Sequence, residues 1–397
     1  MSGMISFDLA LALVAGAATP LPSERVALTM ANRRTLAEPV VAGVDWPPSD
    51  VSAMDGYAVR DGDPWPLTLV GESAPAAPFE GAVGPGECVR IFTGATVPAP
   101  CDRVVPQELV ERDGDRVALI SPTSAARHIR LRGSDFIAGD MLIEAGNRLG
   151  PATLVTAAGA DLAEVWVHRR PRVTILATGD ELVAPGTARH TVASIPDSNS
   201  VGIAALVADH GGQVIAIARL CDDKAQMEAA ARAAVATSDV VIMIGGASVG
   251  DRDHSKSVFA ALGLDLLFAK VAIKPGKPVW FGRVGEVMVI GLPGNPASAM
   301  VTARLLLVPL LIGLSGGKAG AALPWQSRVL AAPLAPLAPS GDRENFVLAR
   351  WAGSAVAPLA DAGSGSQRSL GYAQLLIRQS AGHPGLAAGE SVDVIAL

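Results

Sequence analysis

Strand-like and helix-like hydrophobic patterns alternate between Arg172 and Leu314. Short apolar runs rich in β-branched residues predict buried strands at RVTILAT (172–178), QVIAIARL (213–220) and DVVIMIGG (239–246). The segments between them begin with polar capping residues and predict helices over 197–212 and 221–238, and a longer helix is expected over 296–314. This β-α-β-α-β order predicts a central, doubly wound, mostly parallel sheet with helices on both faces.

The rest of the chain follows other patterns. Residues 4–17 and 150–164 are expected to be helical, with a second helical piece over 23–37. Short runs between Gly and Pro residues predict a β-rich inserted module, and a similar pattern after about Ala319 predicts a C-terminal β-barrel-like domain. The predicted fold class is therefore multidomain α/β plus β. Its parts are a discontinuous helical N-terminal domain (1–41 and 143–170), the inserted β-rich module (42–142), the α/β domain (171–316) and the C-terminal β domain (317–397).

Composition excludes several classes of protein. Half of the residues (50%) are hydrophobic and 18% are charged, which is typical of globular domains. A net charge of −6 with 4% aromatic residues argues against nucleic-acid binding. The apolar run 303–314 is interrupted by Arg304 and Pro309, so no membrane span is expected, and no export signal is evident. Cys88, Cys101 and Cys221 lack metal-ligand spacing, which favours a reducing, cytoplasmic location.

Polar residues follow each predicted strand of the central sheet. Ligands of an open parallel sheet bind beyond the carboxyl ends of its strands, so residues at these positions are expected to share one edge. The candidates are Asp180, Glu181, Asp222, Asp223, Asp251, Asp253 and Asn295. Carboxylates without a cluster of Cys or His suit a hard cation such as Mg²⁺, which also bridges phosphate oxygens.

Lysines are concentrated in the same part of the chain. Only six of the 32 basic residues are lysines, and four of those six fall between Lys256 and Lys277. Compact ammonium groups gathered in one place indicate an oxyanion or phosphate site, in which Lys270, Lys274 and Lys277 would neutralise the ligand. The alternative is compositional, since a chain biased towards arginine has few lysines and their clustering can arise by chance. The segment GGASVG adds backbone N–H groups that can face a phosphate, from Gly245, Gly246, Ser248 and Gly250.

Other interpretations of these residues stay open. Asp180 could cap a turn, and Asp222 or Asp223 could cap the following helix. Gly245 and Gly246 could serve only a tight strand exit, and His254 is expected to form structural or ligand-facing hydrogen bonds, not to ligate a metal. The loop prolines could only stiffen the backbone; they are Pro275, Pro278, Pro293 and Pro296. GxxxxGK[ST], GxGxxG after the first strand, HExxH and GxSxG are absent, which argues against P-loop nucleotide binding and dinucleotide-dependent dehydrogenation.

Eight segments, spread over nearly the full length, also resemble a known family. They are PPSDVSAMDGYAVR, RIFTGATVP, LRGSDFIAGD, TGDELVAPG, DSNS, GGASVGDRDH, KVAIKPGKPVWFG and GLPGNPAS. In number and order they are similar to those of the molybdopterin molybdenumtransferases, the MoeA family of molybdenum insertases that includes the E domain of gephyrin. The resemblance implies a homodimer with an N-terminal dimerisation domain. It also implies a reaction in which adenylylated molybdopterin and molybdate give molybdenum cofactor and AMP, assisted by Mg²⁺ or another divalent metal such as Zn²⁺.

The resemblance also implies site residues. The positions that match functional residues of the family are Asp55, Thr93, Asp135, Glu181, Asp222, Asp253, Lys270 and Lys274. Glu181, Asp222 and Asp253 are the implied metal ligands. The expected substrate-binding residues are Gly245, Gly246, Ser248, Gly250, Lys277, Pro293 and Asn295, joined through looser C-terminal matches by Arg343 and Ser364. In the implied dimer, Asp55 and Thr93 complete a site on the partner subunit.

The chain departs from the family pattern in two places. It has PPSDVSAMDG where PPFDNSAMDG is usual, and Gln367 and Arg368 stand before Ser369 where apolar residues are commoner. Use of tungstate or a diverged paralogue is therefore an alternative. Two other functions remain as alternatives: adenylyl transfer onto molybdopterin, and non-catalytic binding of the pterin.

Overall fold

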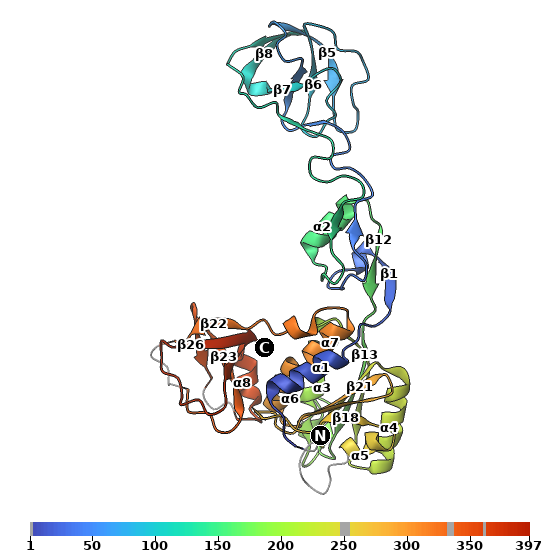
Figure 1. Ribbon diagram of the computed structural model, residues 1–397, viewed down its shortest axis with the longest axis vertical. Coiled ribbons are helices and arrows are strands. Elements are labelled where there is room, and N and C mark those ends of the chain that lie inside the picture. Colours follow the sequence, from blue (N-terminus) through green and yellow to red (C-terminus); the bar gives the residue numbers. More distant parts are fainter. Residues whose placement is uncertain (1–2, 247–254, 332–336, 360–362) are drawn as a thin grey trace. The chain divides into compact units, whose positions relative to one another are not determined.

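The computed structural model describes residues 3–246, 255–331, 337–359 and 363–397 (Figure 1). The chain forms two compact units. Unit 1 comprises residues 1–24, 33–37 and 166–397, and unit 2 comprises residues 25–32 and 38–165. The four-part division expected from the sequence stays a prediction, and each unit is described by itself.

A six-stranded sheet forms the centre of unit 1. Its order is β16 (Gln213–Leu220), β13 (Arg172–Thr178), β17 (Val240–Ile244), β21 (Val287–Leu292), β20 (Trp280–Val284) and β18 (Asp265–Phe268). The first four strands pair in parallel, and the last two pair antiparallel at one edge. This confirms the predicted strands and their parallel pairing, and it adds an antiparallel edge.

Alternate residues of the central strands enter two separate hydrophobic cores. On β13, Val173 and Ile175 pack in one core with residues of helices α1 (Phe7–Ala17) and α3 (Ser198–Asp209). Leu176 packs in the other core, with residues of α4 (Lys224–Thr237) and α5 (Ser255–Ala260). The sheet is therefore covered by helices on both faces, as predicted. Asp197 caps α3 by accepting the Ser200 N–H, and Asp223 caps α4 by accepting the Gln226 N–H.

The long apolar helix is a core helix with an irregular turn. It runs over Pro296–Leu314 as α6 (Pro296–Thr302), a π-helical turn η4 (Ala303–Leu307) and α7 (Val308–Leu314). In this turn the Val308 N–H reaches the Ala303 carbonyl, just ahead of Pro309, which has no N–H to donate. The helix that contains the run 303–314 has 19 residues and, in spite of Arg304 and Pro309, is long and apolar enough to cross a membrane by length and composition alone. However, 89% of an apolar 18-residue stretch of this helix is buried inside the protein.

The C-terminal part of unit 1 is a β structure, as expected. Its strands are β22 (Gln326–Val329), β23 (Glu344–Ala352), β24 (Ala355–Pro358), β25 (Leu375–Gln379) and β26 (Ser391–Ala396). They pair in the order β24-β23-β25-β26-β22, and a bridge from Leu330 to Val356 links the end of β22 back to β24. Strand β19 (Ile273–Lys274) also pairs with β23, so Lys274 lies at the edge of this sheet. The short helix α8 (Gln367–Tyr372) precedes β25.

Unit 2 contains the expected β-rich module. Its six-stranded sheet has the order β7 (Arg103–Pro106), β4 (Gly56–Val59), β6 (Glu87–Ile91), β5 (Leu67–Ser73), β9 (Arg116–Leu119) and β8 (Val110–Asp113). Two further antiparallel pairs join β2 (Val40–Val41) with β11 (Met141–Ile143) and β3 (Val51–Ser52) with β10 (Ile129–Arg130). The expected helix over 150–164 is present as α2 (Pro151–Gly159) and ends earlier than predicted.

The second helical piece expected over 23–37 was wrong. Residues 23–27 form strand β1 (Ser23–Ala27), followed by a single 3₁₀ turn η1 (Leu28–Met30). Strand β1 pairs with β12 (Glu164–His168), which is far away in the sequence. This long-range pairing overrides the weak local preference for a helix.

A carboxylate whose side chain is 11% exposed holds together the beginnings of the central strands. Asp239, which precedes β17, accepts two hydrogen bonds from the Arg169 guanidinium (2.6 and 2.7 Å) and one from the Arg172 N–H (2.7 Å). Burial opposes ionisation of this carboxyl group, but the hydrogen bonds outweigh burial and lower the pKa of Asp239. Because a lowered pKa favours the folded state only while the carboxylate is ionised, Asp239 links stability to pH.

We expect Asp239→Asn to lower the free energy of unfolding by about 1.5–3 kcal/mol at pH 7, since it removes charge-assisted hydrogen bonds. The loss is present above the unfolded-state pKa of about 3.9 and disappears as the pH falls through the lower folded-state value. Urea denaturation of both proteins between pH 7 and pH 2 measures it. The control is Asp265→Asn, because Asp265 pairs with Arg283 at an exposed site and should cost under about 1 kcal/mol. Equal losses in the two variants would contradict the assignment.

Candidate functional site

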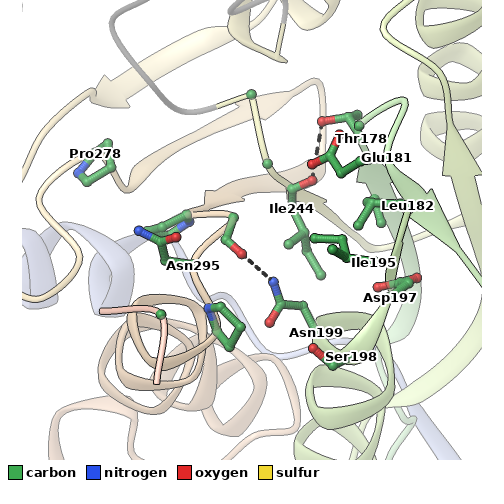
Figure 2. Close-up of a pocket in the computed structure, with 18 of the residues that line it drawn as sticks. Thr178, Glu181, Leu182, Ile195, Asp197, Ser198, Asn199, Ile244, Pro278 and Asn295 are labelled. Carbon is green, nitrogen blue, oxygen red and sulfur yellow. Dashed lines mark hydrogen bonds between the residues drawn. The ribbon is translucent and has the colours of Figure 1, made fainter. Parts of the chain in front are cut away.

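A cleft of about 840 Å³ opens at the carboxyl ends of the four parallel strands. Its walls come from the loops that follow β13, β16, β17 and β21 and from the start of α3. Figure 2 shows Glu181 beside Thr178 and Ile244 on one side, and Asn295 and Pro278 across from them. Eight predicted site residues line this cleft: Glu181, Asp222, Gly245, Gly246, Lys270, Lys277, Pro293 and Asn295.

A smaller cleft of about 550 Å³ adjoins the first. The two clefts share Lys277, Pro278, Pro293 and Asn295, so they form a continuous surface depression. The smaller cleft contains the remaining predicted residues of unit 1 that the structure describes, which are Lys274, Arg343 and Ser364. Asn295 ties the two together, because its side-chain amide donates a hydrogen bond to the Ser364 hydroxyl (3.1 Å).

The acidic residues at this edge divide into those that cap turns or helices and those that line the larger cleft. Asp180 accepts the Asp222 N–H (2.9 Å), which fits its alternative interpretation as a turn cap. Asp223 caps α4 and does not line the larger cleft. Glu181 and Asp222 line the cleft as exposed carboxylates. The rule that ligands bind beyond the carboxyl ends of parallel strands therefore placed these residues at the correct edge of the sheet. It could not distinguish residues that cap a turn or helix from residues that line the cleft.

Three carboxylates line the larger cleft: Glu181 and Asp222 are exposed, whereas Asp197 is buried and caps α3. Mg²⁺ is commonly held by one or two carboxylates together with phosphate oxygens of the substrate, and Glu181 and Asp222 provide such a pair. Among the described residues, no group of three or more His, Cys, Asp or Glu side chains could hold a metal by itself. The third predicted ligand, Asp253, lies outside the described residues, as do Ser248, Gly250, Asp251 and His254.

The lysines give the clefts a positive side. Lys270 and Lys277 line the larger cleft, and Lys274 and Lys277 line the smaller one. In the part of the chain that the structure describes, none of these three ammonium groups forms an ion pair with a carboxylate. Their charges are therefore available to a bound anion.

Two helix starts also face the larger cleft. Ser198 and Asn199 begin α3, and Asn295 and Pro296 begin the long helix, so the positive ends of both helix dipoles lie at the cleft. Asn199 donates a hydrogen bond to the Gly294 carbonyl (2.7 Å), which fixes one loop to the other (Figure 2). The sequence did not single out Asn199 as a site residue. The DSNS segment, which marked a helix start, was the available signal.

Gly245 has a backbone that a side chain would disturb. Its φ is +93°, in the left-handed region that favours glycine. A Cβ atom at this position would lie 2.7 Å from the Thr178 carbonyl oxygen. Both the conformation and the close approach to β13 therefore require glycine at the end of β17, which confirms the tight strand exit and leaves a phosphate role as a prediction.

Two of the three predicted site residues of unit 2, Asp55 and Thr93, contact each other. The N–H and hydroxyl of Thr93 both donate to one oxygen of Asp55, at 2.7 and 2.8 Å. These hydrogen bonds lower the pKa of Asp55 and keep its carboxylate charged. Asp135 is exposed in the same unit, and its N–H donates to the Trp46 carbonyl (3.1 Å). These three residues are described within unit 2 alone.

Comparison with protein families matches both units. The MoeA N-terminal region (domain I and II) matches residues 5–160, and the probable molybdopterin binding domain matches residues 174–312. The second match spans the central sheet and most of the loops that form the larger cleft. The fold and the cleft therefore define a multidomain protein of molybdenum cofactor biosynthesis.

Relatives of similar sequence specify the family. The molybdopterin molybdenumtransferase of a Nostoc species is 36% identical over 311 residues, 74% of this chain and 70% of the relative. That of Haemophilus influenzae is 38% identical over 303 residues, 75% of this chain and 74% of the relative. A crystal structure of a molybdopterin biosynthesis MoeA protein from Pyrococcus horikoshii matches 99% of both chains with a TM-score of 0.82 and 28% identity. The chain belongs to the molybdopterin molybdenumtransferase family, and it is a transferase.

We expect Gly245→Ala to destabilise unit 1 by at least about 1 kcal/mol more than Gly263→Ala. Gly263 also has a positive φ (+85°), but open space surrounds its Cβ position, so this control measures the backbone cost alone. The additional cost at Gly245 comes from the contact with the Thr178 carbonyl. Urea denaturation of the two variants measures the difference. Equal destabilisation would show that the contact with the Thr178 carbonyl adds no free-energy cost at Gly245.

Proposed function

We propose that the protein inserts molybdate into adenylylated molybdopterin, releasing AMP and forming molybdenum cofactor, with assistance from Mg²⁺ or another divalent metal such as Zn²⁺. The observation that supports this proposal most strongly is that carboxylates and lysines line the same surface depression. Glu181 and Asp222 supply carboxylates, while Lys270, Lys274 and Lys277 supply cations without carboxylate partners in the described chain. The relatives' function as molybdenumtransferases supports the same reaction.

The larger cleft suits the phosphoanhydride of the substrate. Cleavage of this linkage builds negative charge on the phosphate oxygens, which Lys270, Lys277 and the two helix starts can stabilise without reorganisation. Glu181 and Asp222 would hold the divalent metal, with Asp253 as the expected third ligand. When bound, the metal would neutralise phosphate charge as a Lewis acid. The loops around Gly245 and Gly294 bring backbone close to the ligand.

The smaller cleft suits molybdate. Lys274, Lys277 and Arg343 line it, and none of its described lining residues is a carboxylate. A dianionic oxyanion can therefore bind there by direct cationic and hydrogen-bonding contacts, including the Ser364 hydroxyl. Because Lys277 and Asn295 belong to both clefts, an anion in the smaller cleft lies next to a nucleotide in the larger one.

We further propose that the protein is a cytoplasmic homodimer. The family resemblance supports a site in which Asp55 and Thr93 of one subunit serve the cleft of the partner subunit. The hydrogen bonds from Thr93 fix the Asp55 carboxylate in one orientation and keep it ionised, as a charged group that acts on a substrate requires.

The competing function within enzymes, adenylyl transfer onto molybdopterin, is not favoured. The chain matches the MoeA N-terminal region as well as the molybdopterin binding domain, and its matched relatives are molybdenumtransferases over most of their length. Non-catalytic binding of the pterin is the other alternative, and the assay described next separates it from turnover.

We expect AMP release from adenylylated molybdopterin to require both molybdate and a divalent metal. The assay measures AMP with each component present or withheld, for the purified full-length chain. Binding of the pterin without molybdate-dependent AMP would support the carrier function and contradict the insertase. Consumption of ATP with molybdopterin would instead support adenylyl transfer.

The same assay tests the cation cluster. Lys274→Ala should raise the molybdate concentration needed for half-maximal rate about 10- to 150-fold, the equivalent of about 1.5–3 kcal/mol for one charge-assisted contact. Lys318→Ala is the matched control, because Lys318 is exposed and lines neither cleft. An unchanged molybdate dependence in Lys274→Ala would exclude this lysine from the oxyanion site.

A further inference from the structure

Arg90 of unit 2 lies close to the pair that Asp55 and Thr93 form. It is on strand β6, directly across from Tyr57 of β4 in the antiparallel register. Strand β6 ends just before Thr93, and β4 begins at Gly56, directly after Asp55. The pairing of these two strands therefore brings both members of the pair to one end of the sheet, next to Arg90.

The guanidinium of Arg90 is hydrogen-bonded to the chain segments around Asp55. Its Nη1 donates to the Gly56 carbonyl (2.9 Å), and its Nη2 donates to the Gln107 side-chain oxygen (2.5 Å). Gln107 begins the 3₁₀ turn η2 (Gln107–Leu109), and its N–H donates to the Asp55 carbonyl (3.1 Å). Arg90 therefore holds the backbone after Asp55 directly and the Asp55 carbonyl through Gln107.

Two aromatic rings hold the same guanidinium. Its carbon lies 5.3 Å from the centre of the Tyr57 ring and 4.9 Å from the centre of the Phe92 ring. A guanidinium over the face of an aromatic ring at this distance is attracted by the ring electrons. Tyr57 is buried in a hydrophobic core of unit 2, and Phe92 directly precedes Thr93. Arg90 therefore links the segment of Asp55 to the segment of Thr93.

The positive charge of Arg90 also acts on Asp55. In the part of unit 2 that the structure describes, Arg90 forms no ion pair with a carboxylate, and the oxygens that accept its hydrogen bonds are uncharged. Its charge is therefore not neutralised by a close partner. Hydrogen bonds from the N–H and hydroxyl of Thr93 are the main cause of the lowered pKa of Asp55, and the charge of Arg90 lowers this pKa further.

Other charged residues lie on the elements that pack against β4. They are Glu87 of β6, Arg103 of β7 and Glu108 of η2. Each has another partner: a backbone N–H for Glu87, a carboxylate for Arg103 and a side-chain amide for Glu108. Arg90 is therefore the residue of these elements whose unpaired charge faces Asp55.

We propose that Arg90 is a positioning residue that holds the Asp55 carboxylate and the Thr93 hydroxyl in the arrangement used for molybdate insertion. This role rests on the proposed function, which assigns Asp55 and Thr93 to the reaction. Arg90 does not touch the substrate. It orients the two side chains through the backbone beside them and keeps the carboxylate ionised through its charge, so that neither has to be reorganised during the reaction.

Titration of the Asp55 carboxyl group by NMR tests the effect of the charge without any substrate. The full-length chain is labelled with ¹³C-aspartate, and Asp55→Asn assigns the resonance. Arg90→Gln should raise the pKa of Asp55, whereas Arg90→Lys keeps the charge and should preserve most of the lowering. Arg112→Gln is the matched control, because Arg112 donates to a backbone carbonyl from β8, at the far edge of the same sheet. It should leave this pKa unchanged.

The AMP-release assay tests the orienting role. Arg90→Gln should lower kcat about tenfold or more at an unchanged KM for adenylylated molybdopterin, since misplacement of a group that acts on the substrate slows turnover strongly. Arg90→Lys should recover only part of kcat, because an ammonium cannot reproduce the two hydrogen bonds and the ring contacts of a planar guanidinium. Arg112→Gln should turn over at the wild-type rate.

The outcomes separate this role from a structural one and from the proposed function. In an active wild-type protein, an Asp55 pKa and a kcat in Arg90→Gln that equal those of Arg112→Gln would overturn the positioning role. A raised KM at unchanged kcat would also overturn it, since that result indicates direct contact with the substrate. If Arg90→Gln fails to fold, an unchanged kcat in Arg90→Lys overturns the role instead. Full activity of Asp55→Asn would overturn the assignment of Asp55 under the proposed function.

Discussion

The parallel register of four neighbouring strands is the constraint on which the rest of the structure depends. β13 pairs with β16 and β17, and β17 pairs with β21, all in the same direction, so their carboxyl ends open at one edge. Loops leaving this edge carry Glu181, Asp222 and Asn295 into one cleft, although these residues are more than a hundred positions apart at the extremes. The same register gathers the strand beginnings at the other edge, where Asp239 joins Arg169 and Arg172.

The two adjoining clefts differ in the charged residues that line them, and this difference indicates what each cleft can bind. The larger cleft combines carboxylates with lysines and helix starts, which suits a phosphate-bearing substrate assisted by a metal. The smaller cleft is cationic in its described lining, which suits a small dianion bound without a metal. Buried apolar residues such as Ile244 and Leu292 anchor the strand ends beneath these polar loops. The packed core therefore holds the loops that carry these lysines and carboxylates in place before a ligand binds.

The sequence predicted the parts of the structure that local patterns control. The strands and helices of the central sheet followed from hydrophobic periodicity, and the cleft edge followed from the rule for parallel sheets. The helix expected over 23–37 failed because β1 is defined by a partner strand far away in the sequence. Asn199 was missed because its contact with Gly294 joins two loops that only the fold brings together. Whether an acidic residue caps a turn, as Asp180 does, also depends on such contacts.

A crystal structure of the protein with AMP, molybdate and Mg²⁺ tests the central claim most directly. We expect the AMP phosphate in the larger cleft within contact distance of Lys270 or Lys277, and the metal between this phosphate and the carboxylates of Glu181 and Asp222. We also expect molybdate in the adjoining cleft, beside Lys274. Well-defined AMP and molybdate bound away from the carboxyl ends of β13, β17 and β21 would contradict the account.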